Sequence, residues 1–291
     1  MTAPTLEHVR TAIAASGYPL QFRVAKRFAE LGFSVHPSFR FLNRAKGREA
    51  EIDLNASHHT TRETRSGKKV DIMTRVGVEV KDSELPFVLF GLDPAPGPDP
   101  TSDTLDSDFA YVDIATTRDA GIPRRFGFAA LDNLLNKGWS KSTHHQLGAR
   151  PRFHCATSME QVKGGFKLNL TDKLWKALSA LGAYADFSQH SWQSALEKTD
   201  LEAMLGGGLH IVVTYLMLVH RGPHYRHVVG ATDVSESQFS SVFLSLAASD
   251  VNIAFVVDFV EMEHLSIAVD RLLATTAGLV EGLVPTIFAS S

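Results

Sequence analysis

Residues 209–219, LHIVVTYLMLV, form a near-continuous apolar run, and this run constrains the fold more than any other feature of the sequence. It has the length of a strand, and apolar residues without alternation are typical of a central strand that is buried on both faces of a sheet. Residues 251–260 form a second buried strand of this kind, and helical patterns cover residues 171–185, 235–248 and 262–277. This half of the chain therefore predicts helices alternating with buried strands.

The first ninety residues predict two helices followed by a β-meander. The helices are expected at residues 5–15 and 19–31, and the strands at 33–42, 49–57 and 70–81, with polar turns between the strands. A further strand is expected at 109–114 and a short helix at 128–136. Residues 92–108 are a proline-rich loop, and 138–165 are polar and aperiodic. The fold class is α/β, and residues 1–291 are interpreted as a single elaborated domain.

Two carboxylates and a lysine are expected on one face of this meander. The period of a strand is two, so Glu79 and Lys81 point to one face while Val80 points to the core. Asp53 lies in the preceding strand, and antiparallel pairing brings it beside Glu79. Two neighbouring acids cost free energy unless a divalent cation neutralises them. Mg²⁺ prefers oxygen ligands, so the expected site consists of both carboxylates and the carbonyl of Val80.

These segments resemble the PD-(D/E)XK nuclease superfamily in order and spacing. The matching stretches are SGYPLQ at 16–21, GFSV at 32–35, REAEID at 48–53 and VEVKDS at 78–83. The resemblance implies a restriction-endonuclease-like mixed sheet flanked by helices, with an α-β-β-β-α-β core and C-terminal additions. It also implies cleavage of nucleic acid, with DNA favoured, that depends on Mg²⁺ or Mn²⁺.

The resemblance also implies roles for individual residues. Asp53 takes the place of the family's metal-binding aspartate, Glu79 that of the second acid, and Lys81 that of the catalytic lysine, which positions or activates water. Gln21 stands where many members place a glutamate on the first long helix. A neutral amide can hold a water molecule but adds no charge to the site. Ile52 replaces the family's proline and does not touch the chemistry.

The charge distribution is consistent with a nucleic-acid partner. The net charge is −3, yet residues 1–81 hold 14 Lys and Arg against 8 Asp and Glu. Basic groups beside an acidic metal site are suited to binding phosphates. The residues expected to contact nucleic acid are Arg23, Arg48, Lys68 and Lys69. A solvated, charged hairpin is the alternative interpretation of the same residues.

Other patterns limit the functions that remain. Neither a signal peptide nor an apolar run of about twenty residues is present, so we expect a cytoplasmic protein without a membrane partner. The single cysteine, Cys155, excludes an internal disulfide framework. The absence of a Gly-x-Ser-x-Gly motif argues against a serine hydrolase. A catalytically weak or inactive nuclease fold that binds nucleic acid, a protein partner or a second copy of the chain stays open as the alternative.

Two further groups of residues admit more than one interpretation. Residues 220–227 contain three histidines, for which a charged turn is favoured over a zinc site. Trp175 lies in the helical pattern at 171–185, and a place in the core is favoured over a role in stacking on a base.

Overall fold

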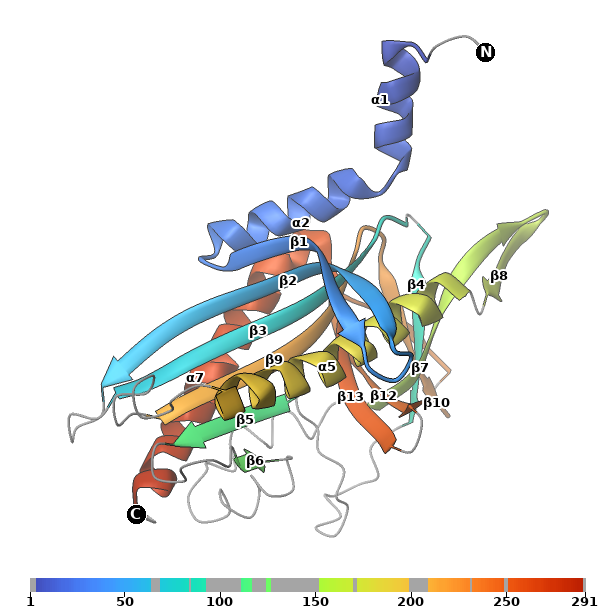
Figure 1. The fold of residues 1–291 in the computed structure, drawn as a ribbon. Coiled ribbons are helices and arrows are strands. Elements are labelled where there is room, and N and C mark those ends of the chain that lie inside the picture. The colour runs from blue at the N-terminus through green and yellow to red at the C-terminus, as the bar shows by residue number, and fades with distance from the viewer. Residues whose placement is uncertain are drawn as a thin grey trace.

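The computed structural model describes residues 4–63, 69–83, 85–92, 111–116, 124–126, 152–169, 172–198, 209–230, 232–248 and 251–289. The chain is mixed α/β, as expected (Figure 1). Outside the described residues lie Lys68, the helix expected at 128–136, and all but the first residue of the proline-rich loop.

The N-terminal helices and the meander form where the sequence predicts them. Helix α1 covers Leu6–Ala15 and α2 covers Tyr18–Glu30, and Gly17 between them has a φ of 75°. This left-handed conformation favours glycine and separates the two helices. Strands β1, β2 and β3 then follow as an antiparallel meander over Ser34–Asn43, Arg48–Glu63 and Lys69–Lys81.

Strand β9, Leu209–His220, is the central strand that the apolar run predicts. It pairs in parallel with β3 from Val70↔Leu209 to Lys81↔His220. Its other edge pairs with β5 (Tyr111–Thr116) and then with β13 (Val251–Glu261). Every side chain described in β9, from residue 210 to 220, is buried. Parallel strands need a crossover connection, and helix α5 (Asp172–Lys198) lies within this one.

The remaining strands extend the sheet beyond β13. The hydrogen-bonded order is β1-β2-β3-β9-β13-β12-β7-β4-β10-β11, with β5, β6 and β8 beside this path, and together they make a 13-stranded sheet. The strands not yet given are β4 (Phe87–Leu92), β6 (Arg124–Phe126), β7 (Arg152–Val162), β8 (Gly165–Asn169), β10 (His224–Val229), β11 (Val234–Ser237) and β12 (Phe239–Ala248).

Two expectations about this part of the chain are wrong. Residues 235–248 form strands rather than a helix, because β12 pairs antiparallel with β13 from Phe239↔Val260 to Ala248↔Val251. Ser240, Val242 and Leu244 are buried while Ser241 is only half-buried, which is the period of a strand. The aperiodic segment also contains β7, which pairs with β4. At the end of the chain, a short 3₁₀ helix (Met262–His264) precedes α7, Leu265–Ala289, which extends the expected closing helix.

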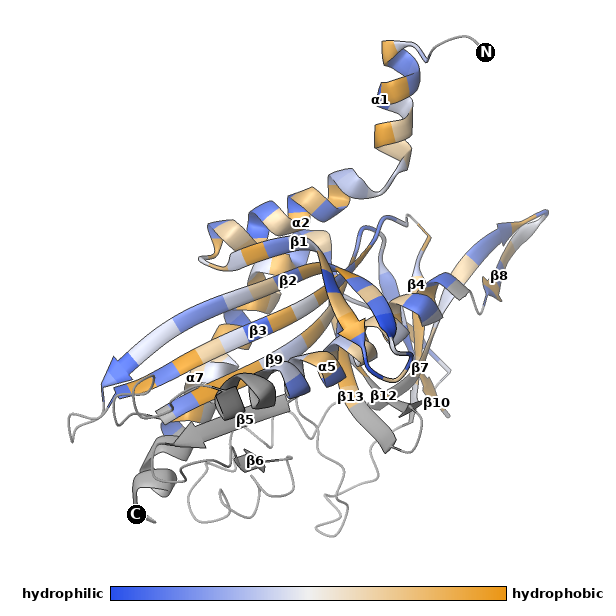
Figure 2. Ribbon diagram, in the orientation of Figure 1, coloured by the Kyte–Doolittle hydropathy of each residue, from blue (hydrophilic) through white to orange (hydrophobic). Residues whose placement is uncertain are grey.

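Helices cover both faces of the central strands. On one face, α2 and α7 pack on an apolar cluster that includes Phe28, Val78, Val80 and Val219. On the other face, α5 packs on a cluster around Tyr184. Figure 2 shows hydrophobic residues along β3, and hydrophilic residues toward the outer end of β2, where the strand extends beyond these helices. None of the described helices is long and apolar enough to cross a lipid bilayer.

A close contact fixes α5 on the sheet. A Cβ atom added to Gly77 would lie 2.4 Å from Cδ1 of Tyr184, so only glycine lets the ring approach β3 this closely. The Tyr184 hydroxyl donates a hydrogen bond of 2.7 Å to Oδ1 of Asn55, and burial raises the pKa of Tyr184 to about 12. Trp175, on the same helix, is 45% exposed, so a place in the core is wrong for this residue.

Candidate active site at the fork between two strands

Strands β2 and β3 separate at the position of the expected site. Their ladder runs from Glu63↔Lys69 to Leu54↔Val78 and ends there, whereas β2 remains paired with β1 as far as Arg48. A fork opens between the two strands beyond Leu54. Asp53 is the first residue of β2 past this point, and Glu79 is the first residue of β3 past it.

The carboxylate of Asp53 bridges the fork. Its Oδ2 atom accepts a hydrogen bond of 2.7 Å from the backbone N–H of Val80. In an antiparallel ladder, a hydrogen-bonded residue presents its N–H and its C=O to the same neighbouring strand. The carbonyl of Val80, expected as a metal ligand, is therefore expected to face the fork as well.

Gln21 supports the backbone of Asp53 from helix α2. Only 5% of this residue is exposed, and its Nε2 atom donates a hydrogen bond of 2.7 Å to the backbone oxygen of Asp53. A longer contact of 3.4 Å joins Nε2 to Oγ of Ser38 in β1. Ser38 has a φ of 49°, which is uncommon for a residue other than glycine. The Gln21 amide thus contacts the backbone at the fork and not the carboxylates.

Glu79 and Lys81 form an ion pair at the fork. Lys81 Nζ lies 2.8 Å from Glu79 Oε2, and the exposed fractions of the two side chains are 27% and 8%. Burial raises the pKa of Glu79 to about 7. The Lys81 ammonium opposes this rise, and the Asp53 carboxylate adds to it. The Asp53 carboxylate therefore lies near enough to Glu79 to favour the protonated form of that acid.

The side chains at the fork offer a donor set that fits Mg²⁺ or Mn²⁺. Two carboxylates and a backbone carbonyl supply oxygen ligands, which these ions prefer, and water or a substrate phosphate supplies the rest. A carboxyl group whose neutral form is favoured gains most from a neighbouring cation. No cluster of three or more acidic, histidine or cysteine side chains occurs among the described residues. At the fork, the groups that could hold such an ion are the carboxylates of Asp53 and Glu79 and the carbonyl of Val80.

The basic residues that the sequence singled out lie apart from one another. Arg23 on α2 and Arg48 at the start of β2 are exposed. Lys69 is also exposed, but it lies at the opposite end of β3. Glu79 lies ten residue steps further along the strand, which corresponds to about 33 Å. The structure does not bring Lys69 to the fork.

A buried histidine pair beside the fork was not expected. His220 follows the apolar run and is paired with Lys81 in the ladder, and His224 begins β10. Both are fully buried, their rings lie 5.1 Å apart, and burial lowers their pKa values to about 4 and about 3. An exposed, charged turn is therefore wrong for these two residues. The sequence does indicate burial for His220, because this residue directly follows the apolar run of β9.

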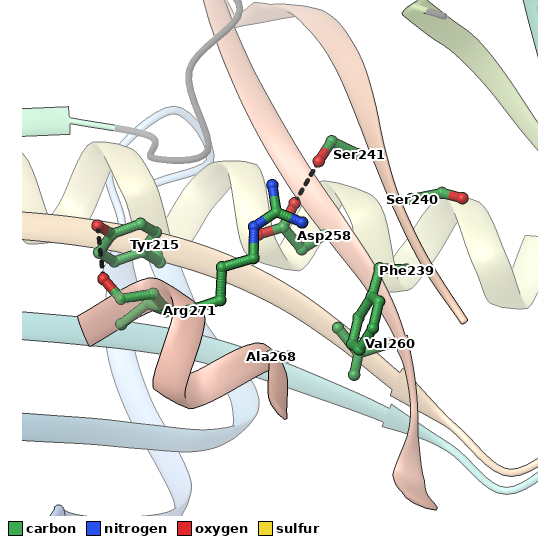
Figure 3. A pocket seen from close by; sticks show the side chains of 9 residues that line it. Tyr215, Phe239, Ser240, Ser241, Asp258, Val260, Ala268 and Arg271 are labelled. Atoms are coloured by element: carbon green, nitrogen blue, oxygen red, sulfur yellow. Dashed lines mark hydrogen bonds between the residues drawn. The ribbon is translucent and has the colours of Figure 1, made fainter. Parts of the chain in front are cut away.

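A hollow between α7 and the sheet offers a different chemistry. It opens to solvent and is lined by polar and apolar side chains from β9, β12, β13 and α7 (Figure 3). Ser241 donates a hydrogen bond of 2.6 Å to Asp258, and the Tyr215 hydroxyl lies 2.8 Å from that of Thr276. Asp258 is the single carboxylate among its lining residues, so this hollow lacks the pair of acids found at the fork.

Comparisons with known proteins give no functional assignment, so the assignment rests on the geometry of the fork. No protein-family model matches the chain, and neither a similar curated protein nor a similar solved structure was found.

Proposed function

We propose that the chain is a Mg²⁺-dependent phosphodiester hydrolase of restriction-endonuclease-like fold that acts on nucleic acid, with DNA as the expected substrate. The meeting of Asp53, Glu79 and Lys81 at the β2–β3 fork carries this proposal. The order of elements α2, β1, β2, β3, α5 and β9, with β9 parallel to β3, supports the fold. It corresponds to the α-β-β-β-α-β core that the resemblance implies, with β4 to β8 inserted before α5.

Asp53, Glu79 and the carbonyl of Val80 would hold the metal ion. When bound, the ion supplies Lewis-acid stabilisation of a phosphate oxygen and lowers the pKa of a water ligand. Glu79 serves as a ligand in its ionised form, which its pKa of about 7 makes dominant only above neutral pH. Cleavage is therefore expected to increase as the pH rises through about 7.

Lys81 is the residue that orients the attacking water and accepts its proton. Its Nζ atom is held by Glu79 at 2.8 Å, and its side chain is 27% exposed, so it is fixed in place yet accessible. The ammonium group has three donors, which orient a water molecule for in-line attack on phosphorus. In its neutral form, the amine accepts the proton that this water loses. Exposed Arg23 and Arg48 are candidates for contacts with more distant phosphates.

A nuclease-like fold that binds without cutting is the second candidate. The observation in its favour is Gln21, which stands where members of the nuclease superfamily that the sequence resembles often carry a glutamate, and which donates a hydrogen bond to the backbone of Asp53. Such a fork carries less negative charge and holds a metal ion less tightly. Both candidates bind nucleic acid, but only the first cleaves it.

Cleavage by wild-type protein and by Lys81→Ala, with Mg²⁺ or Mn²⁺ on single-stranded and duplex DNA and on RNA, tests the proposal. We expect wild-type protein to cut and Lys81→Ala to lose about a hundredfold or more in rate. Lys26→Ala is the matched control, because Lys26 also pairs with a glutamate, Glu30, but lies exposed on α2 away from the fork. This control should cut as wild type does.

Other results would separate the candidates. Equal rates for wild type and Lys81→Ala would remove Lys81 from the mechanism. Wild-type protein that binds nucleic acid but cuts none of these substrates with either metal would favour the second candidate. Binding is therefore measured separately, without metal, by the anisotropy of labelled oligonucleotides.

A further inference from the structure

The β1–β2 hairpin continues beyond the fork and turns onto helix α5 (Figure 1). Leu54 belongs to the apolar cluster on the α2 face of the sheet, whereas Ile52, two residues earlier in β2, belongs to the cluster around Tyr184 of α5. Residues two apart on a regular strand share a face, so the hairpin twists between these two positions. The part of the hairpin beyond the fork, residues 39–52, therefore leaves β3 and packs on α5.

Two aromatic side chains hold this part of the hairpin in place. The ring centre of Phe41 lies 5.8 Å from that of Tyr184, and the ring centre of Phe39 lies 6.2 Å from it. Tyr184 in turn packs against Gly77, which precedes Glu79 by two residues in β3. Packing through α5 therefore fixes the position of the hairpin relative to the fork.

The hairpin tip, residues 43–48, carries three basic residues, Arg44, Lys46 and Arg48, and all three are exposed. The turn is closed, because Asn43 is paired with Arg48 and the backbone N–H of Lys46 donates a hydrogen bond of 3.1 Å to Oδ1 of Asn43. Gly47 has a φ of 61°, and a Cβ atom added there would meet nothing within 4 Å. Consecutive Cα atoms are about 3.8 Å apart, so those of the three basic residues lie within about 10 Å of one another.

The three cations of the hairpin tip have no acidic partner among the described residues. Most other basic side chains of the N-terminal segment do lie within 3.8 Å of a carboxylate, namely Arg10, Lys26, Arg27, Arg40 and Arg62. Among the lysines and arginines described within residues 4–63, Arg23 alone shares the lack of a partner.

The acids beside the hairpin tip leave it with a net positive charge. Glu51 is paired with Arg40 at 3.4 Å. Glu49 directly follows Arg48 in β2, so the two side chains point to opposite faces of the strand. The tip is therefore complementary to an anionic partner.

We propose that the hairpin tip binds the phosphate backbone of duplex DNA. A duplex presents one negative charge per about 1.7 Å of its axis, which is twice the density of a single strand. The aromatic residues of the hairpin, Phe39 and Phe41, pack on α5, and the tip itself contains no ring on which an unpaired base could stack. The inference rests on the proposed function in one respect, namely that nucleic acid is the substrate. It adds that this substrate is a duplex and names the residues that hold it.

The distance between the hairpin tip and the fork allows one duplex to reach both. Arg48 precedes Asp53 by five residues, which corresponds to at most about 17 Å along the strand. Each base pair adds about 3.4 Å along a duplex, so about five base pairs span this distance. Contacts to phosphates carry no sequence information, and binding at the tip is therefore expected to be independent of sequence.

Binding of fluorescein-labelled duplex DNA of about twenty base pairs, without metal and at a series of salt concentrations, tests the inference. Arg44→Gln, Lys46→Gln and Arg48→Gln should each weaken binding about fivefold at about 0.1 M salt. Each should also flatten the slope of log Kd against log salt concentration by about 0.9, the change expected for one lost phosphate contact. Lys46→Arg should keep the affinity and the slope, because it keeps the charge.

Lys26→Gln is the matched control. It removes the same charge from a lysine that is exposed on α2 and already paired with Glu30, so the slope should stay as in wild type. All the substituted side chains are exposed and contribute little packing, and equal midpoints of thermal denaturation would show that the variants are folded.

Several results would overturn the inference. They are wild-type affinity and slope in all three variants of the hairpin tip, an equal loss in Lys26→Gln, no binding of the duplex by wild type, tighter binding of a single strand of the same sequence, or displacement of the duplex by anionic phospholipid vesicles. The metal-free assay keeps this test distinct from that of the proposed function. Weakened binding in the variants of a protein that never cuts supports the inference and refutes the hydrolase. Cleavage by wild type with unchanged binding in the variants does the reverse.

Discussion

At the scale of single residues, the protonation of Glu79 makes the stability of the protein depend on pH. Its pKa lies near 7 in the folded protein and near 4.5 in an unfolded chain, and burial is the main cause. Between these values the native state holds a proton that the unfolded chain has released. The contribution of Glu79 to stability is therefore full below about pH 4.5 and is lost as the pH rises through about 7.

Glu79→Gln should remove this dependence, because a neutral amide does not titrate. Relative to the variant, wild-type protein should lose on the order of 3 kcal/mol of unfolding free energy between pH 4.5 and pH 8, in the absence of metal. Urea denaturation of both proteins at several pH values measures the difference. Glu49→Gln, which changes an exposed carboxyl of the same hairpin, is the control. If the difference in unfolding free energy between wild type and Glu79→Gln did not change with pH, the raised pKa of this buried acid would be contradicted.

Gln21 shows what a single residue of the sequence cannot reveal. The resemblance to the nuclease superfamily predicts that Gln21 lies near the site, and its amide contacts the backbone of Asp53. The amide also lies 3.4 Å from Oγ of Ser38, whose φ is 49°, and local propensity does not predict that a serine adopts a positive φ. The carboxylates of the site follow from alternation, whereas this support does not.

At the scale of elements, the contact between Gly77 and Tyr184 fixes α5 over the meander. Gly77→Ala should destabilise the protein by about 1–3 kcal/mol, because the new Cβ would lie 2.4 Å from the buried ring. Gly278→Ala in α7 is the contrasting control. An added Cβ meets nothing within 4 Å there, and alanine in a helix is favoured by about 0.5–1 kcal/mol. Thermal denaturation should move the two midpoints in opposite directions, and an unchanged midpoint for Gly77→Ala would contradict the packing.

Most elements near the site could be predicted, because their burial and their propensity agree. The strands at 49–57 and 70–81 alternate, and the helix at 19–31 has a regular apolar face; all three form. The segment at 235–248 is a strand because β13 offers ten pairing positions, a long-range contact that overrides local helical spacing. The sequence of β7 is polar and therefore resembles a loop. The strand forms because it pairs with β4, which lies about sixty residues earlier in the chain, and local sequence does not reveal such a partner.

At the scale of the whole molecule, stability should decrease from the central strands outward. The backbone of β9 is paired on both sides and buried, whereas α1 has no buried residue (Figure 1). Hydrogen exchange of the native protein should therefore be slowest for amides in β9 and β3 and fastest for those in α1 and at the tip of the β7–β8 hairpin. Protection of α1 equal to that of β9 in a dilute monomer would contradict this order.

The pairing of β3 with β9 also has a consequence for biosynthesis. Lys81 pairs with His220, which follows 139 positions later in the chain, so the meander leaves the ribosome long before its central neighbour. Contacts between residues that are so distant in sequence form late, because closing a long loop costs entropy before the contact is gained. During synthesis, therefore, Asp53, Glu79 and Lys81 lie on a three-stranded ribbon that has α2 but not yet β9 beside it. The fork is completed only after β9 has been translated, so a growing chain carries no finished site.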